Sequence, residues 1–290
     1  MKKLLIIFAV ILLISCAAPV EMINKPVSFQ SKDGLTVYGY VSKPAGSGKF
    51  PAVILIHGGS PPGAQNYTRW EKYAEELNKK GFATLALDYR GSSGYGKSFE
   101  DKAELGGKET DDVIAAIDFI EKEDFVDKDR IALVGESHGA FMALLAAEKD
   151  KRVKAVVDLY GFPDAISQFT YFTQSIAEGG YHDTPEKRAL LEKILAERGL
   201  PAENKAAYES FSPAAHVKDL ESPVLILHGM KDKSVLPSQS IEFEKLLKEN
   251  NKESEMRLYD TLGHEFITND TAEAADAMAT TADFLERKLK

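Results

Sequence analysis

Short runs of apolar residues, each followed by glycine or by a charged loop, recur along most of the chain. Five of these runs are almost wholly apolar, at residues 52–56, 83–87, 131–134, 155–159 and 224–227. Short continuous apolar runs are typical of parallel strands in a sheet that helices cover on both faces. The pattern therefore predicts a buried sheet built from these segments.

Stretches with the spacing of amphipathic helices lie between the predicted strands. Apolar positions recur every three or four residues in residues 70–80, 110–121 and 241–250. Earlier in the chain, residues 27–30 and 36–41 alternate in polarity around a turn signal, which predicts an opening hairpin. The alternation of strand and helix predicts an α/β fold with a doubly wound, mostly parallel sheet.

The regular alternation stops between Gly161 and Pro213, where no strand-like run occurs. This stretch holds helical patterns rich in charged and aromatic residues. We therefore expect a helical cap insertion at about residues 162–212, within one α/β domain that spans residues 27–290. The aromatic residues at 169–181 are expected either to form a pocket wall or to pack a helical hairpin.

The first residues differ in composition from the rest. Two lysines precede an apolar run at residues 4–14, which is typical of a secretory signal peptide and short for a membrane span. Residues 13–16, Leu-Ile-Ser-Cys, resemble the bacterial lipobox, and Cys16 is the single cysteine of the chain. We expect a signal peptide at residues 1–16, a spacer at residues 17–26, and an exported lipoprotein of the cell envelope, anchored to a membrane through Cys16. The alternative is a plain signal peptide with an incidental cysteine.

Composition narrows the possible partners. A content of 44% hydrophobic and 28% charged residues is ordinary for a folded protein. The net charge of -9 argues against nucleic acid as a partner, because nucleic-acid binders usually carry clustered positive charge.

A candidate nucleophile follows one of the predicted strands. The run at residues 131–134 leads directly into Gly135-Glu136-Ser137-His138-Gly139, and a helical run begins at Ala140. A strand, then G-x-S-x-G, then a helix is the pattern of a nucleophile elbow, in which glycines allow a sharp turn that exposes the serine hydroxyl. We therefore expect Ser137 to be a catalytic nucleophile.

A serine hydroxyl needs a base to take its proton and an acid to orient that base. In this type of fold the three residues follow the order Ser, Asp, His. Asp232 lies just beyond the predicted strand at 224–227, and His264 lies beyond a strand-like run that ends at Tyr259. We expect Asp232 and His264 to complete the triad, with Asp158 as the second choice for the acid.

Acyl transfer also needs donors for the negative oxygen of the tetrahedral intermediate. His57-Gly58-Gly59 follows the strand at residues 52–56 and matches a glycine loop that supplies one backbone donor. We assign this role to Gly59, with Ser60 as a second candidate, and the other donor to the amide of His138. The alternative for this loop is a simple Gly-Gly turn.

Taken together, these residues resemble the catalytic domain of the prolyl oligopeptidase serine hydrolases, including their acylaminoacyl-peptidase-like branch. The resemblance covers the chain from about residue 27 to its end. It rests on the His57-Gly58-Gly59 loop, the Tyr-Arg-Gly-Ser-Ser-Gly-Tyr-Gly string at residues 89–96, the elbow at Ser137, Ser212-Pro213, and His228-Gly229 followed by Asp232. Carried over by position, it implies Ser137, Asp232 and His264 as the triad.

Two features depart from the family pattern. Peptidases of this family usually carry a β-propeller ahead of the hydrolase domain, whereas the spacer at residues 17–26 leaves no room for one. Members that stand alone are similar to carboxylesterases and to dienelactone-hydrolase-like proteins as well. The elbow also has Glu136 and Ala140 where family peptidases more often have small residues or another glycine.

The sequence therefore predicts a serine hydrolase of the α/β-hydrolase fold that needs no metal and no cofactor. Its expected substrates are short peptides, aminoacyl amides or small carboxylic esters, cleaved through an acyl-serine intermediate. Two alternatives remain: a stand-alone carboxylesterase with no peptidase activity, and a non-catalytic binding protein of the cell envelope.

Overall fold

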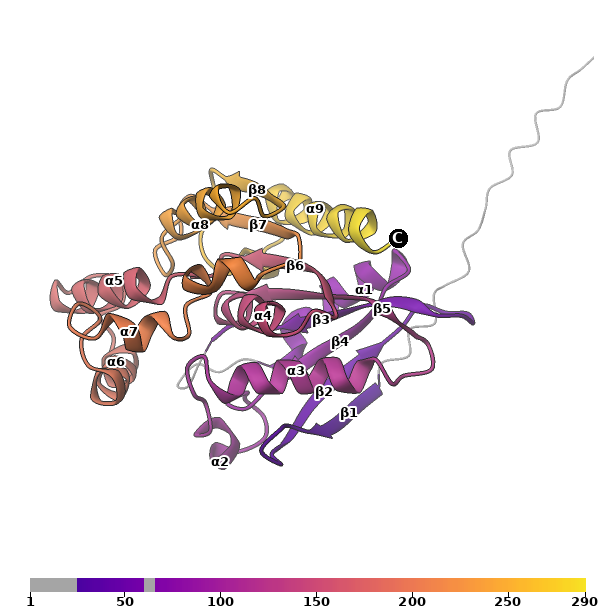
Figure 1. The fold of residues 1–290 in the computed structure, drawn as a ribbon, viewed down its shortest axis with the longest axis horizontal. Helices are drawn as coiled ribbons and strands as arrows, with labels where there is room; N and C mark the ends of the chain where they lie inside the picture. The colour runs from indigo at the N-terminus through magenta and orange to yellow at the C-terminus, as the bar shows by residue number, and fades with distance from the viewer. Residues whose placement is uncertain (1–24, 60–65) are drawn as a thin grey trace, which may run out of the picture.

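The structure, a computed structural model, describes residues 25–59 and 66–290. Within these ranges the chain folds around an eight-stranded sheet (Figure 1). The strands are, in chain order, β1 (Lys25–Gln30), β2 (Thr36–Ser42), β3 (Phe50–Ile56), β4 (Ala83–Asp88), β5 (Val126–Glu136), β6 (Val153–Leu159), β7 (Val224–Gly229) and β8 (Ser254–Tyr259). All the predicted strands are present.

The strand order across the sheet is β1-β2-β4-β3-β5-β6-β7-β8. Strands β1 and β2 form the predicted antiparallel hairpin, and β2 pairs antiparallel with β4. The remaining strands are parallel, from β4 through β8. The carboxyl ends of the parallel strands therefore meet along one edge of the sheet, where open α/β sheets bind their ligands.

Helices cover both faces of the sheet, as the apolar runs predict. Helices α3 (Lys108–Ile120), α4 (His138–Lys149) and α8 (Ser238–Glu249) pack their apolar sides on one face. Helices α1 (Glu71–Lys79) and α9 (Ala272–Leu289) pack on the other. The result is a doubly wound α/β fold, and the predicted fold class is confirmed.

The boundaries differ from the sequence pattern in a few places. Residue Trp70 belongs to a 3-10 turn, η1 (Tyr67–Trp70), so α1 begins one residue later than predicted. The sequence pattern did not predict the short helix α2 (Lys97–Glu100) or α9. The buried side of α9 consists largely of alanine and threonine. These residues are only weakly apolar, so the helical spacing is hard to recognise in the sequence although Phe284 and Leu285 belong to it.

Three helices occupy the connection between β6 and β7. They are α5 (Ala165–Ala177), α6 (Pro185–Arg198) and α7 (Lys205–Glu209), and a 3-10 segment, η2 (Pro213–Asp219), leads back to the sheet. Figure 1 shows α5, α6 and α7 grouped beside the sheet rather than on either of its faces. The same part of the chain was expected to form a helical cap.

The N-terminal predictions lie outside the described residues. The signal peptide, Cys16 and most of the spacer fall in residues 1–24, and the second oxyanion candidate, Ser60, falls in residues 60–65. Of the helices in the described ranges, none combines the length and the apolar character that a membrane span requires.

Candidate active site

The sharp turn between β5 and α4 presents Ser137 at the carboxyl edge of the sheet. Ser137 has φ 50° and ψ -118°, a strained conformation for a residue with a side chain. The flanking glycines allow this turn. A Cβ atom on Gly135 would lie 2.3 Å from the Gly139 carbonyl oxygen, and one on Gly139 would lie 2.0 Å from the Ile56 carbonyl oxygen. Only glycine fits at either position.

The three predicted triad side chains form one hydrogen-bonded chain. His264 Nδ1 lies 2.6 Å from Asp232 Oδ2, and His264 Nε2 lies 3.0 Å from Ser137 Oγ. Because a carboxylate only accepts hydrogen bonds, Nδ1 donates to Asp232 and Nε2 is left to accept the serine proton. Each residue follows the carboxyl end of a different strand: β5, β7 and β8.

Further hydrogen bonds hold the carboxylate of Asp232 in place. Its Oδ1 accepts from the backbone amides of Ser234 and Val235, at 2.8 and 3.0 Å. Its Oδ2 lies 3.1 Å from His228 Nε2 as well as close to His264. Burial alone raises the pKa of Asp232, but the hydrogen bonds from His228 and His264 outweigh it and hold this pKa well below its usual range. The acid is therefore ionised at neutral pH.

Asp158, the second choice for the acid, has a different environment. One of its oxygens accepts from the backbone amide of Gly161 at 2.7 Å, and the other has no hydrogen-bond partner among the described residues. Burial raises the pKa of Asp158 to about 6. The partner of His264 is Asp232, so the structure favours the first choice on geometry.

The two predicted oxyanion donors lie beside the nucleophile. Gly59 has φ +76°, a left-handed conformation that favours glycine. A Cβ atom on the preceding Gly58 would lie 3.1 Å from Ser137 Cβ, so this loop packs directly against the elbow. His138 is the first residue of α4, and the first amides of a helix have no partner within it. Both Gly59 and His138 line the same pocket as Ser137.

Charged and phenolic side chains contact Glu136, the residue before Ser137 in the elbow. Glu136 is buried and receives two hydrogen bonds from Arg69, together with one of 2.6 Å from the hydroxyl of Tyr160. The Tyr160 ring also makes an edge contact with His264, with 4.8 Å between the ring centres. Neither Arg69 nor Tyr160 is predicted from the sequence as part of the site. The hint in the sequence is Glu136 itself. An acid in the tight elbow is expected to be buried, and a buried carboxylate needs a hydrogen-bonding or charged partner.

The buried histidines near the triad are held in hydrogen bonds of their own. His138 Nε2 lies 2.7 Å from Glu109 Oε2, and His57 Nε2 lies 2.7 Å from Ser92 Oγ. Burial lowers the pKa of His57 to about 4, which keeps its ring neutral at neutral pH. Within residues 25–59 and 66–290, no group of three or more His, Cys, Asp or Glu side chains is arranged to hold a metal ion.

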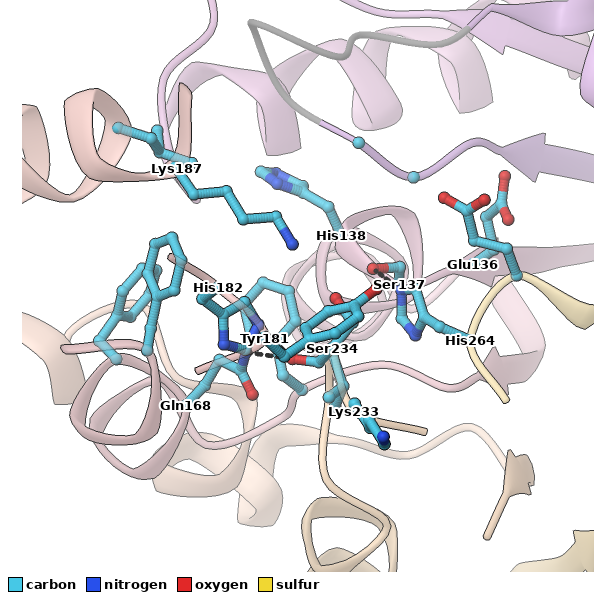
Figure 2. A pocket seen from close by; sticks show the side chains of 18 of the residues that line it. Glu136, Ser137, His138, Gln168, Tyr181, His182, Lys187, Lys233, Ser234 and His264 are labelled. Carbon is cyan, nitrogen blue, oxygen red and sulfur yellow. Dashed lines mark hydrogen bonds between the residues drawn. The ribbon is translucent and has the colours of Figure 1, made fainter. Parts of the chain in front are cut away.

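A pocket of about 490 Å³ opens above Ser137 and His264 (Figure 2). Its apolar lining comes from the cap helices and from neighbouring loops. These residues are Leu105, Phe162, Phe169, Phe172, Leu190, Ile194 and Val235. The aromatic residues Phe169, Phe172 and Tyr181 of the insertion thus form part of the wall, whereas Tyr171 lines a separate hollow. Volume and lining suit a small molecule or a short peptide segment.

The sequence of the chain matches a known family. Residues 67–290 match the sequence model described as the prolyl oligopeptidase family. The chain is 29% identical over 248 residues to the uncharacterized peptidase YuxL of Bacillus subtilis, covering 83% of this chain and 35% of that protein. It is 28% identical over 236 residues to the uncharacterized peptidase YtmA of the same organism, covering 81% of this chain and 83% of that protein. The chain thus spans about a third of YuxL and most of YtmA.

Among solved structures, the fold is similar to that of the acylaminoacyl peptidase of Pyrococcus horikoshii. The TM-score is 0.76 at 22% sequence identity, and the match covers 93% of this chain and 42% of that one. At this identity the likeness establishes the fold alone. The family match over residues 67–290 confirms the resemblance drawn from the sequence.

Proposed function

Because the chain belongs to the prolyl oligopeptidase family, we propose that it is a serine hydrolase that cleaves peptide, amide or carboxylic ester bonds of small substrates. The observation that carries this proposal is the hydrogen-bonded chain from Ser137 through His264 to Asp232. A nucleophile, a base and an orienting acid in this order are the parts that acyl transfer requires.

In the acylation step, Ser137 Oγ attacks the carbonyl carbon of the substrate while His264 Nε2 takes the hydroxyl proton. The negative Asp232 stabilises the imidazolium that results. His264 then gives this proton to the leaving nitrogen or oxygen, so that the scissile bond breaks and an acyl-serine ester remains. Water repeats the same sequence on the ester, which releases the acid and restores the serine hydroxyl.

The negative oxygen of each tetrahedral intermediate needs hydrogen-bond donors. The backbone amides of Gly59 and His138 are proposed for this role. Their support is their position beside Ser137, together with the start of α4, whose dipole favours negative charge at this end.

A side-by-side assay of the purified chain and its Ser137→Ala variant tests the proposal. The substrates are short-chain p-nitrophenyl esters and aminoacyl or prolyl p-nitroanilides. Ser137-dependent cleavage of the anilides supports a peptidase, and cleavage of the esters alone supports a stand-alone carboxylesterase. If neither set is cleaved, or if Ser137→Ala cleaves as well as the wild type, the proposal fails and a binding protein becomes the better account.

We also propose that the protein is exported and anchored to a membrane of the cell envelope through a lipid on Cys16. The support is sequence alone: the two lysines, the apolar run at residues 4–14 and the lipobox-like residues 13–16. The test is expression of the full chain and of its Cys16→Ala variant in a bacterial host. The proposal requires the wild type in the membrane fraction with an acylated N-terminus, and the variant must lose that lipid.

A further inference from the structure

Lys187 lies in the first turn of α6 and lines the pocket that contains Ser137. Figure 2 shows its side chain reaching from the cap helix into the pocket, with the ammonium group directed toward the space beside Ser137 and Tyr181. The cap therefore places a cation in the space that the substrate has to occupy.

The ammonium group of Lys187 contacts an aromatic ring rather than a carboxylate. Its Nζ lies 4.5 Å from the centre of the Tyr181 ring, a cation-π contact that restrains the group and leaves its N–H donors open. Among the residues that the structure describes, no carboxylate forms a hydrogen-bonded ion pair with Lys187, although the charge of Glu265 attracts it. Burial lowers the pKa of Lys187, and the attraction to Glu265 offsets part of this shift.

Other charged groups lie around the same pocket, and of these Glu265 acts on Lys187 through its charge. The carboxylate of Glu136 is bound by Arg69, and Glu265 also lies near Arg69, at 4.0 Å. Glu186 adjoins Lys187 in the first turn of α6, and Lys231 and Lys233 add two more cations to the lining. In Figure 2 the ammonium of Lys233 is directed away from Ser137.

On the basis of the function proposed above, we propose that the pocket selects substrates that carry a carboxylate and that Lys187 binds this group. Two sources share this chemistry. The carboxylate belongs either to the acyl part of the substrate, as in a succinyl group, or to the leaving part, as the free C-terminus of a short peptide.

The surroundings of Lys187 favour a carboxylate over a phosphate. A phosphate group is usually bound by several donors or by the planar fork of arginine. Lys187 supplies one point charge, and Leu190 and Ile194, which follow it on α6 and line the same pocket, add no donors. With the ammonium of Lys233 directed away from Ser137, one ammonium group beside the apolar side of α6 matches a monoanion attached to an apolar body.

Two matched pairs of substrates separate the sources. The first pair is succinyl-Phe p-nitroanilide and butyryl-Phe p-nitroanilide, and the second is acetyl-Phe-Ala and its C-terminal amide. We expect kcat/KM to favour the charged member of one pair by about tenfold. Lys187→Met should abolish this preference, and Lys187→Glu should invert it. Lys193→Met, on the same helix but outside this pocket, should keep it.

The experiment distinguishes failure of the carboxylate preference from failure of the proposed hydrolase function. If the substrates are cleaved but neither pair shows a preference, or if the preference survives Lys187→Met, the inference is overturned and the proposed function stands. If nothing is cleaved, calorimetric binding of the same pairs to the Ser137→Ala variant decides. Tighter binding of a charged member that is lost on adding Lys187→Met supports the inference, and equal or absent binding overturns it.

Discussion

The guanidinium of Arg69 binds both carboxylate oxygens of Glu136, with Nε 2.5 Å from Oε1 and Nη2 2.9 Å from Oε2. Glu136 is the residue before the nucleophile, and Arg69 lies in the η1 turn that follows the glycine loop. The ion pair therefore ties two segments of the active site together, 67 residues apart in the sequence.

Removing Arg69 alone should leave the buried carboxylate of Glu136 without its cation, with the hydroxyl of Tyr160 still donating to it. Only 1% of the Glu136 side chain is exposed, against 17% for Arg69. We expect Arg69→Met to lower the free energy of unfolding by about 2–3 kcal/mol, and Arg69→Met/Glu136→Gln to recover part of this loss. Urea denaturation of both variants measures the difference. A double variant less stable than the single one would contradict the account.

The choice of acid can be tested with two matched substitutions. Asp232→Asn removes the acceptor that orients His264, so we expect kcat to fall by about 10³–10⁴ without loss of the fold. Asp158→Asn changes a buried acid that binds Gly161 rather than His264, and kcat should stay within about tenfold of the wild type. Steady-state kinetics on one good substrate suffice. Similar losses in both variants would argue against the assignment of Asp232.

Because the backbone at Ser137 is strained, replacing this serine with glycine should stabilise the fold while it abolishes activity. Its φ of 50° and ψ of -118° are costly for any residue with a Cβ atom. We expect Ser137→Gly to raise the free energy of unfolding by about 1 kcal/mol relative to Ser137→Ala, since relief of strain exceeds the entropy cost of glycine. Both variants should be inactive. Equal thermal stability of the two variants would show that the turn stores no strain.

Glu148, near the end of α4, should make stability depend on pH. Burial raises its pKa to about 8, and the nearby Asp219 adds to this shift. Between pH 4.5 and 8 the folded state holds a proton that the unfolded chain releases, so stability is lost as pH rises through this range. Glu148→Gln removes this dependence. Its unfolding free energy relative to wild type should therefore be higher at pH 8 than at pH 5 by roughly 2–4 kcal/mol.

Denaturation of the wild type and of Glu148→Gln at both pH values measures this effect. Glu123→Gln, at a surface turn before β5, serves as the matched control. A difference between wild type and Glu148→Gln that is the same at pH 5 and pH 8 would mean that Glu148 titrates normally.

The parts of the site that the sequence predicts are those with strong local constraints. Only glycine fits at positions 135 and 139 of the elbow, and a strand whose last residues are mostly apolar leads into it. The order of Ser137, Asp232 and His264 follows from the order of the strands that carry them. Such features are visible in short segments of the sequence.

The supporting contacts depend on distant packing, and the sequence does not reveal them. Arg69 reaches Glu136 because the η1 turn lies beside the elbow, and Lys187 reaches the pocket because the first turn of α6 borders it. His228 ends a buried strand in the sequence pattern, and only the fold shows that it also contacts Asp232. The residues that tune the site are therefore the ones that require a three-dimensional structure.

Covalent labelling tests the central claim most directly. The purified chain is treated with a fluorophosphonate, an analogue of the acyl group under attack, and the adduct is located by mass spectrometry. The account predicts one adduct on Ser137, no adduct in Ser137→Ala, and labelling slowed by at least about a hundredfold in His264→Ala. Labelling at another residue, or an unchanged rate in His264→Ala, would contradict a catalytic triad of Ser137, His264 and Asp232.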